Sequence, residues 1–157
     1  LAEEGADIIA IDLCKDIETI GYPMATPEDL EETADLVKNL NRRIVTAEVD
    51  VRDGAGVAGV FAEIDRQFGR LDALVCSAGV TRDTLLTASE DADYEAVLAT
   101  NLLGVVRVCR EAARTWEAPD GRVVEVSART IEERALRSDQ EGRVLWLGLA
   151  ARAARSP

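Results

Sequence analysis

The chain has 157 residues, 47% of them apolar and 31% charged, which is typical of a single soluble globular domain. Its net charge of −12 argues against a nucleic-acid partner, because binding to phosphate requires a cationic face. Three cysteines without metal-ligand spacing, and the absence of histidine, predict no metal site, no disulfide framework and no His-based catalysis.

Hydrophobic periodicity predicts alternating strands and helices along the first 128 residues. In chain order, the expected elements are a helix end at 1–4, a strand at 6–13, a helix at 26–41, a strand at 43–49, a helix at 54–68, a strand at 71–76, a long helix at 90–116 and a short strand at 122–127. This order predicts a parallel sheet covered by helices on both faces, which is an α/β fold.

The two ends of the sequence differ from this pattern. The chain starts within what reads as the last turn of a helix, closed by Gly5, so we expect the beginning of the domain to be absent. Beyond Ser127 the periodicity weakens, and residues 121–157 carry seven basic residues, all of them arginine. No apolar run approaches the roughly 18 residues of a membrane span. The first residues also lack the order of a signal peptide, so we expect no membrane partner and a cytoplasmic location.

The stretch Leu71–Val80 organises the predicted sheet. Its apolar run fits a strand buried on both faces, and the small residues Ser77, Ala78 and Gly79 after it would let a ligand approach the backbone. A nucleotide ribose or phosphate could lie there, although a tight strand-to-helix turn has the same composition. Cys76 stands among apolar residues, which favours a small core residue over a reactive thiol.

Three polar residues stand where such a sheet places its ligands. Asp12 ends the first strand, where an acid can accept hydrogen bonds from ribose hydroxyls and repel a 2′-phosphate, or can simply begin a turn. Asp50 ends the next strand and has two similar interpretations, an adenine contact or a turn that caps a helix. Asn101 lies in a helix face otherwise built of Leu and Val, so its amide requires a buried partner, which is a catalytic group or only neighbouring backbone.

Taken together, these residues resemble the short-chain dehydrogenase/reductase family of NAD(P)-dependent oxidoreductases over residues 1–128. The motifs that carry the resemblance are, in order, Leu-Ala-Glu-Glu-Gly-Ala, the strand ending at Asp12, Asp50-Val51, Val-Cys-Ser-Ala-Gly and Thr-Asn101-Leu-Leu-Gly104. The insert Cys14–Pro27 is further similar to the carveol-dehydrogenase-like, mycofactocin-coupled subgroup. The resemblance implies a doubly wound Rossmann sheet and reversible oxidation of a secondary alcohol, with a small-molecule alcohol or ketone as substrate.

The resemblance also implies roles for individual residues. Asp12 matches the acid that binds the adenosine ribose, which implies NAD rather than NADP as cofactor, and Asp50 and Val51 match the pair that holds adenine. The run Cys76-Ser77-Ala78-Gly79 matches the Asn-Asn-Ala-Gly motif that lines the cofactor site. Asn101 matches the helix asparagine of the catalytic tetrad, which anchors a water in the proton relay to the catalytic lysine.

Parts of the family pattern are missing from this sequence. The TGxxxGxG turn that cradles the pyrophosphate, and the first strand before it, should precede Leu1. The catalytic serine position falls at Ala128, with Ser127 one residue early as a substitute. The YxxxK pair should follow where this chain has Glu141 and Leu145, so the phenol that would transfer the proton has no counterpart.

We therefore expect residues 1–127 to form an incomplete NAD(P)-binding Rossmann domain and residues 128–157 an atypical tail, for which a reading-frame change in a GC-rich gene is one hypothesis. In the family's sheet the missing first strand lies between the strands 6–13 and 71–76, and the segment Arg143–Leu149 is a candidate to fill that position.

The expected function is that of an NAD(P)-dependent oxidoreductase of this family that is inactive in its present form. One alternative is a non-catalytic remnant with part of an adenosine-binding surface, and another is a truncated product without a function of its own. Because family members often pair through the helix at 90–116, a homo-oligomer through that helix is a further expectation.

Overall fold

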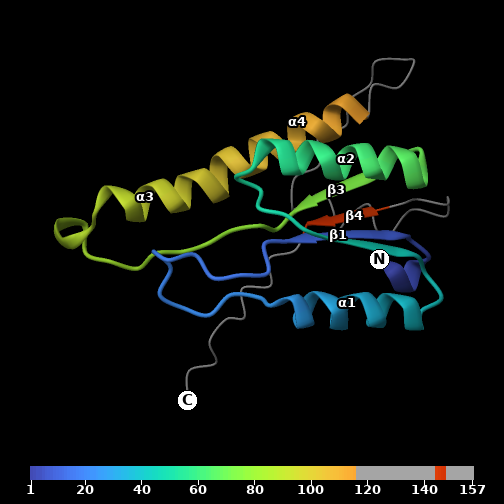
Figure 1. Cartoon of the computed structure of the whole chain (residues 1–157), viewed down its shortest axis with the longest axis horizontal. Coiled ribbons are helices and arrows are strands. Elements are labelled where there is room, and N and C mark those ends of the chain that lie inside the picture. Colours follow the sequence, from blue (N-terminus) through green and yellow to red (C-terminus); the bar gives the residue numbers. More distant parts are fainter. Residues whose placement is uncertain (116–143, 148–157) are drawn as a thin grey trace.

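The computed structural model describes residues 1–115 and 144–147, and the predicted α/β architecture is confirmed there. Four parallel strands form one sheet in the order β2-β1-β4-β3. Helix α1 covers one face of this sheet, while α2 and α4 cover the other (Figure 1). The elements are β1 (Ile8–Asp12), α1 (Pro27–Asn39), β2 (Ile44–Glu48), α2 (Gly54–Phe68), β3 (Ala73–Cys76), α3 (Asp91–Leu98), α4 (Val105–Thr115) and β4 (Val144–Leu147).

Strand β4 lies inside the sheet. It pairs in parallel with β1, where Ile8 stands opposite Val144, and with β3, where Ala73 stands opposite the same residue. The expectation that the segment 143–149 lies between the strands 6–13 and 71–76 is thus confirmed for Val144–Leu147. Because β4 pairs along both of its sides, only β2 and β3 stand at the edges of the sheet that the structure describes.

Signals in the sequence set the ends of the helices. Thr26 and Asp29 form a capping box at the start of α1, in which the Asp29 N–H donates to Thr26 Oγ1 at 3.3 Å and the Thr26 N–H donates to Asp29 Oδ2 at 2.8 Å. Asp53 caps α2 by accepting from the Ala55 N–H at 3.0 Å. Gly69 ends α2 with φ of 67°, a left-handed conformation that favours glycine.

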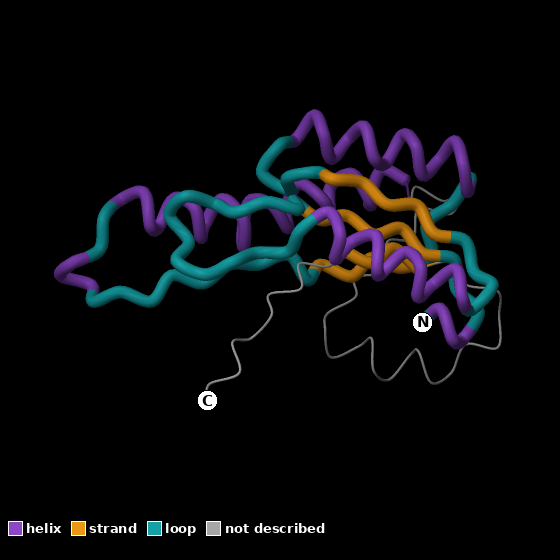
Figure 2. The backbone as a smooth tube through the Cα atoms, turned by 60° about the horizontal axis from the view of Figure 1, so that its bottom comes forward, coloured by secondary structure: helices purple, strands orange, loops and turns teal. Residues whose placement is uncertain are grey.

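Apolar layers hold the helices against the sheet. The layer under α2 and α4 consists of Ile9, Ile11, Val51, Val57, Val60, Phe61, Ile64, Phe68, Leu71, Leu74, Val108 and Ala112. The layer under α1 consists of Ala6, Ile8, Ala10, Cys14, Leu30 and Val37. A third cluster, in which Ile17, Ile20 and Met24 pack with Val80 and Ala96, joins the insert to the loop after β3. Figure 2 shows these loops and α3 extending beyond the end of the sheet.

The helix predicted at 90–116 is helical over the described residues 91–115 but is not one regular α-helix. Between α3 and α4 it contains a π-helical turn, η3 (Ala99–Gly104), a feature that often accompanies functional sites. Gly104 allows this turn to approach Val51 closely, because a Cβ at Gly104 would lie 2.7 Å from Val51 Cγ2. The backbone of η3 is therefore packed directly against the residue that follows Asp50.

Two predictions about burial are wrong. The strand at 71–76 is not buried on both faces, since Leu74 is the buried residue of β3, and β3 has β4 as its one partner in the described sheet. It is β1 that is buried along its whole length. In the helix predicted at 90–116, Leu98, Leu102 and Val106 belong to the face of Leu and Val that was expected to be buried, but they are more than half exposed.

Two smaller elements complete the described structure. The expected helix end at 1–4 is a single 3-10 turn, η1 (Ala2–Glu4), closed by Gly5 with φ of 94°. A second 3-10 turn, η2 (Leu86–Ala88), precedes α3. The strand predicted at 122–127 lies outside the described residues. Within the described residues, no helix is long and apolar enough to cross a membrane.

Candidate cofactor site

Asp12 is the buried acid at the carboxyl end of β1. Only 6% of the residue is exposed, and its Oδ1 accepts the N–H of Cys14 at 2.8 Å. This hydrogen bond closes a turn in which Cys14 takes a φ of 53°. Burial raises the pKa of Asp12 above its ordinary value of 3.8, because the hydrogen bond from Cys14 offsets only part of the lost hydration. Among the described residues no cation forms an ion pair with it.

Asp50 follows β2 and is bound by Arg52. The Arg52 Nε lies 2.9 Å from both carboxylate oxygens, its Nη2 lies 2.7 Å from Oδ2, and its backbone N–H donates to Oδ1 at 2.8 Å. Burial alone would raise the pKa of Asp50, but the hydrogen bonds and charge of Arg52 outweigh it and hold the pKa below its usual value. Arg52 was not foreseen as a partner of Asp50, although an arginine two residues after an acid in a turn is a readable signal.

Four of the predicted residues meet at one shallow pocket of about 10 Å³. Its lining consists of Ile11, Asp12, Leu13, Ile17, Val49, Asp50, Val51, Ala78 and Thr100. Asp12, Asp50, Val51 and Ala78 therefore come together, as expected from the meeting of parallel strand ends at one edge of a sheet. Thr100 was not foreseen. Its Oγ1 is buried without a hydrogen-bond partner in the described structure.

Asn101 fastens the loop after β3. The Val80 N–H donates to Asn101 Oδ1 at 2.8 Å, and Asn101 Nδ2 donates to the Val80 carbonyl at 2.8 Å. The expectation that this residue is part of a buried helix face is wrong, because Asn101 is exposed and lies in η3. Its partner is the backbone of Val80, 21 residues away in the sequence, and its catalytic role stays a prediction. Gly79 lies beside it, where a Cβ would be 3.5 Å from Asn101 Oδ1.

The remaining predicted residues lie apart from this pocket. Ser77 is exposed and is not part of the pocket lining. Ser127 lies outside the described residues, as do Ala128 and Glu141. Cys76 was predicted to be a small core residue, and this is wrong: it is exposed at the end of β3, with its Sγ 3.9 Å from the Sγ of Cys109. No group of three or more metal-binding side chains occurs in the described part of the chain.

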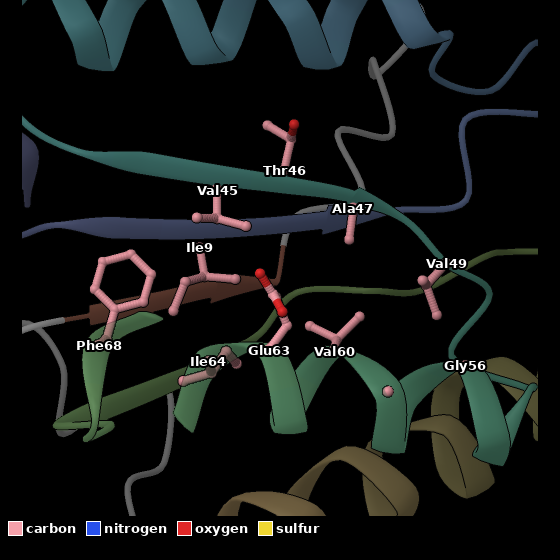
Figure 3. A pocket seen from close by; sticks show the side chains of 11 residues that line it. Ile9, Val45, Thr46, Ala47, Val49, Gly56, Val60, Glu63, Ile64 and Phe68 are labelled. Carbon is pink, nitrogen blue, oxygen red and sulfur yellow. The ribbon is translucent and has the colours of Figure 1, made fainter. Parts of the chain in front are cut away.

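A larger cavity, of about 280 Å³, lies between α2 and the strands β1 and β2 (Figure 3). Aliphatic side chains such as Ile9, Val45 and Val60 line it, and Gly56 and Gly59 leave room on the helix side. Its one acid, Glu63, is bound by Arg66 and Gln67, whose hydrogen bonds lower the pKa of Glu63 to about 2. With one acid already satisfied and otherwise mostly apolar walls, this cavity offers less chemistry than the edge at Asp12.

A known protein family and several known proteins are similar to this chain over most of its length. The family model for short chain dehydrogenase matches residues 2–135. An NAD-dependent oxidoreductase of Mycobacterium tuberculosis is 42% identical over 111 residues, which are 70% of this chain and 40% of that protein. The (-)-trans-carveol dehydrogenase of Rhodococcus erythropolis is 37% identical over 116 residues, which are 71% of this chain and 41% of that enzyme.

Solved structures agree with the sequence relatives. The carveol dehydrogenase of Mycobacterium avium in complex with NAD is 48% identical, with a TM-score of 0.69, over 73% of this chain and 42% of that one. A short chain dehydrogenase of Mycobacterium paratuberculosis bound to NAD is 36% identical, with a TM-score of 0.70 and the same coverage. The chain thus spans less than half the length of these relatives, and it belongs to the short-chain dehydrogenase family.

Proposed function

We propose that this chain forms the adenosine-binding half of an NAD site, within an oxidoreductase that interconverts a secondary alcohol and a ketone. The observation that carries the proposal is Asp12, a buried carboxylate at the carboxyl end of β1 with no cation paired to it in the described residues. An acid in this position accepts hydrogen bonds from the two ribose hydroxyls. It also repels a 2′-phosphate, which favours NAD over NADP.

The residues at this edge fit the adenosine group. Asp12 and Asp50 supply acceptors for ribose hydroxyls and the adenine amino group, and Val51 supplies an apolar wall. The buried Thr100 Oγ1 has no partner in the described structure and is free to bond a ligand or a water. Because the pocket is only about 10 Å³, a nucleotide would lie across its mouth rather than inside it.

The relatives support the cofactor, since two of the similar structures contain NAD. When bound, a nicotinamide group supplies the hydride chemistry. The residues of this chain would bind and orient the adenosine end of the cofactor. Asp12 would bind the ribose, and Asp50 and Val51 would bind the adenine. The small residues Ser77, Ala78 and Gly79 would let the cofactor approach the backbone of the turn after β3. Asn101 would hold that turn through its two hydrogen bonds to Val80.

We further propose that the 157-residue chain binds nucleotide without turning over substrate. Its tyrosines are Tyr22 and Tyr94, and the residues four places after them are Thr26 and Leu98 rather than lysine. A proton donor of the type that the family uses is therefore missing from this sequence, and Ser127 alone does not replace it. The non-catalytic alternative, a remnant with part of an adenosine-binding surface, agrees with this assignment.

Pairing through the helix at 90–116 is also a proposal. Its support is the exposure of Leu98, Leu102, Leu103 and Val106 on η3 and the adjoining helix ends, an apolar group on the surface of the described structure. Sedimentation of the purified chain over a range of concentrations would test it. A monomer at all concentrations would contradict it.

Calorimetric titration with NADH and NADPH tests the binding proposal. We expect NADH to bind, NADPH to bind more weakly, and Asp12→Asn to weaken NADH binding about tenfold through the loss of charge-assisted hydrogen bonds. Asp35→Asn is the control, because Asp35 lies on the exposed face of α1 and pairs with Lys38. Equal binding of NADH by wild type and Asp12→Asn would contradict the role of Asp12. Turnover of a cyclic secondary alcohol with NAD would contradict the second proposal.

A further inference from the structure

Two thiols from distant parts of the chain meet where the end of β3 packs against α4. Cys76 is the last residue of β3, Cys109 lies on α4, and their Sγ atoms are 3.9 Å apart. Both cysteines are free and exposed. We propose that Cys76 and Cys109 are an oxidation site at which a low-molecular-weight disulfide produces an intramolecular disulfide.

The geometry requires only a local movement. A disulfide has an S–S distance of roughly 2.05 Å, so the two sulfur atoms must approach each other by roughly 2 Å. Each cysteine can turn about its own χ1 angle, and Cys76 is followed by the loop at 77–85 rather than by more strand. Exposure of both residues gives a dissolved oxidant access.

The third cysteine provides the contrast. Cys14 is buried beneath α1, its N–H is bound to Asp12, and it belongs to the apolar layer on the opposite face of the sheet. Burial, and then the nearby carboxylates of Asp12 and Glu48, raise the pKa of Cys14 to about 11. Cys14 therefore lacks both a neighbouring thiol and access to an oxidant.

The chemistry proceeds by two thiol–disulfide exchanges. The Cys109 thiol loses its proton to solvent and attacks the oxidant RSSR, which gives a mixed disulfide Cys109–S–SR and releases one RSH. Cys76 then attacks the Cys109 sulfur, a new S–S bond forms, and the second RSH leaves. The two cysteines together lose two hydrogens and two electrons, and the oxidant is reduced to two thiols.

The order of attack follows from the surroundings of the two sulfurs. Although the residue is exposed overall, partial burial of the Cys76 thiol, and then the charge of a Cys109 thiolate, raise the pKa of Cys76 to about 12, so Cys76 is a poor first nucleophile. Once Cys109 is in a mixed disulfide, its sulfur carries no charge and no longer raises the pKa of Cys76. We therefore expect the second exchange to accelerate with rising pH.

The bond would connect the end of β3 to α4 across 33 residues of chain. It would restrict the position of the turn at Ser77, Ala78 and Gly79, which follows Cys76 directly. Closing a loop of this length constrains the unfolded chain, so the oxidised form should unfold at a temperature several degrees higher than the reduced form.

The test is incubation of the 157-residue chain with oxidised glutathione, followed by alkylation, trypsin digestion and mass spectrometry. We expect the intact protein to lose two hydrogens and the peptide 71–82 to be joined to the peptide 108–110. Glutathione attached to both cysteines, a cross-link to Cys14 or a disulfide between two chains would overturn the proposal. The direct mapping uses wild-type protein and needs no variant to fold.

Three variants sharpen the result. Cys76→Ser should retain one glutathione on Cys109, whereas Cys109→Ser should react with glutathione much more slowly because only the poor nucleophile Cys76 remains. Neither variant should show a rise in unfolding temperature with oxidant. Cys14→Ser, the matched control, should form the same cross-link as wild type. Retention of the temperature rise in Cys76→Ser would contradict the proposal. Because the readout is thiol chemistry, this test is independent of whether the chain binds NAD.

Discussion

An aspartate is buried at each end of β1, and the two carboxylates differ in whether a cation is paired with them. Asp7, just before the strand, accepts Arg42 Nη2 at 2.7 Å and Arg43 Nη2 at 2.6 Å. Asp12, at the other end, is equally buried but accepts a backbone N–H and has no ion pair among the described residues. The first arrangement fastens β1 to β2. The second leaves a carboxylate whose charge is unbalanced, which is the arrangement expected of a ligand site.

The pKa shifts express the same contrast. Burial alone would raise the pKa of Asp7, but the hydrogen bonds of Arg43 and the charges of both arginines outweigh it and hold the pKa below 3.8. Burial raises the pKa of Asp12 above 3.8. Ionisation of Asp7 therefore stabilises the folded state, whereas ionisation of Asp12 destabilises it.

The largest effect is expected from Asp7→Asn. The substitution removes the carboxylate that Arg42 and Arg43 share, so we expect a loss of about 2–3 kcal/mol in the free energy of unfolding. This loss is smaller than that of a fully buried pair, because both arginines are partly exposed to water. Urea denaturation measures it. Asp35→Asn, which breaks the exposed pair with Lys38, should change stability by less than about 0.5 kcal/mol. Equal effects of the two substitutions would contradict the structural role of Asp7.

Gly104→Ala tests the packing at the other end of the sheet. The added Cβ meets Val51 Cγ2 at 2.7 Å, so we expect a loss of about 1–2 kcal/mol as the π turn and the Val51 loop move apart. Gly59→Ala is the control, because a Cβ there meets nothing within 4 Å and should stabilise α2 by about 0.5–1 kcal/mol. A stabilising Gly104→Ala would show that the close approach of η3 is wrong.

Asp12→Asn should act in the opposite direction to Asp7→Asn. Asparagine can still accept the Cys14 N–H, and the penalty for burying a charge disappears, so we expect a gain of up to about 1 kcal/mol at neutral pH. Thermal unfolding in the absence of nucleotide measures it. A large loss of stability would place Asp12 with Asp7 as a structural acid.

The pH dependence has opposite signs for the two variants. The stability that Asp7 contributes is present above pH 3.8 and is lost as the pH falls through its lowered pKa. The contribution of Asp12 is present below pH 3.8 and is lost as the pH rises through its raised pKa. The difference in the free energy of unfolding between each variant and wild type should therefore shrink in acid. At neutral pH this difference is a loss of stability for Asp7→Asn and a gain for Asp12→Asn. Parallel pH profiles would contradict the assignment.

Much of the carboxyl edge could be predicted from the sequence because polar residues there follow apolar strands directly. Asp12, Asp50, Val51 and Ala78 meet because parallel strands bring their carboxyl ends to one edge. Thr100 could not be placed in advance, since the direction of its side chain depends on the π turn. The exposure of Cys76 depends on the position of β3 in the sheet, which periodicity does not give.

The contact between Cys76 and Cys109 could not be predicted from the sequence either. The two residues are 33 positions apart, and only the packing of α4 against β3 brings them together. The position of β4 was foreseen from the family's sheet order rather than from its own pattern, because a short apolar run does not show which strands it will pair with.

The most direct test is an NMR titration of the ¹⁵N-labelled chain with NAD. If the carboxyl edge binds adenosine, the amides of Cys14, Val51 and Ala78 should shift with added nucleotide, while those of Ile8 and Arg43 at the arginine-paired end should not. Shifts centred on Asp7 and its arginines, or no shifts at millimolar NAD, would contradict the account.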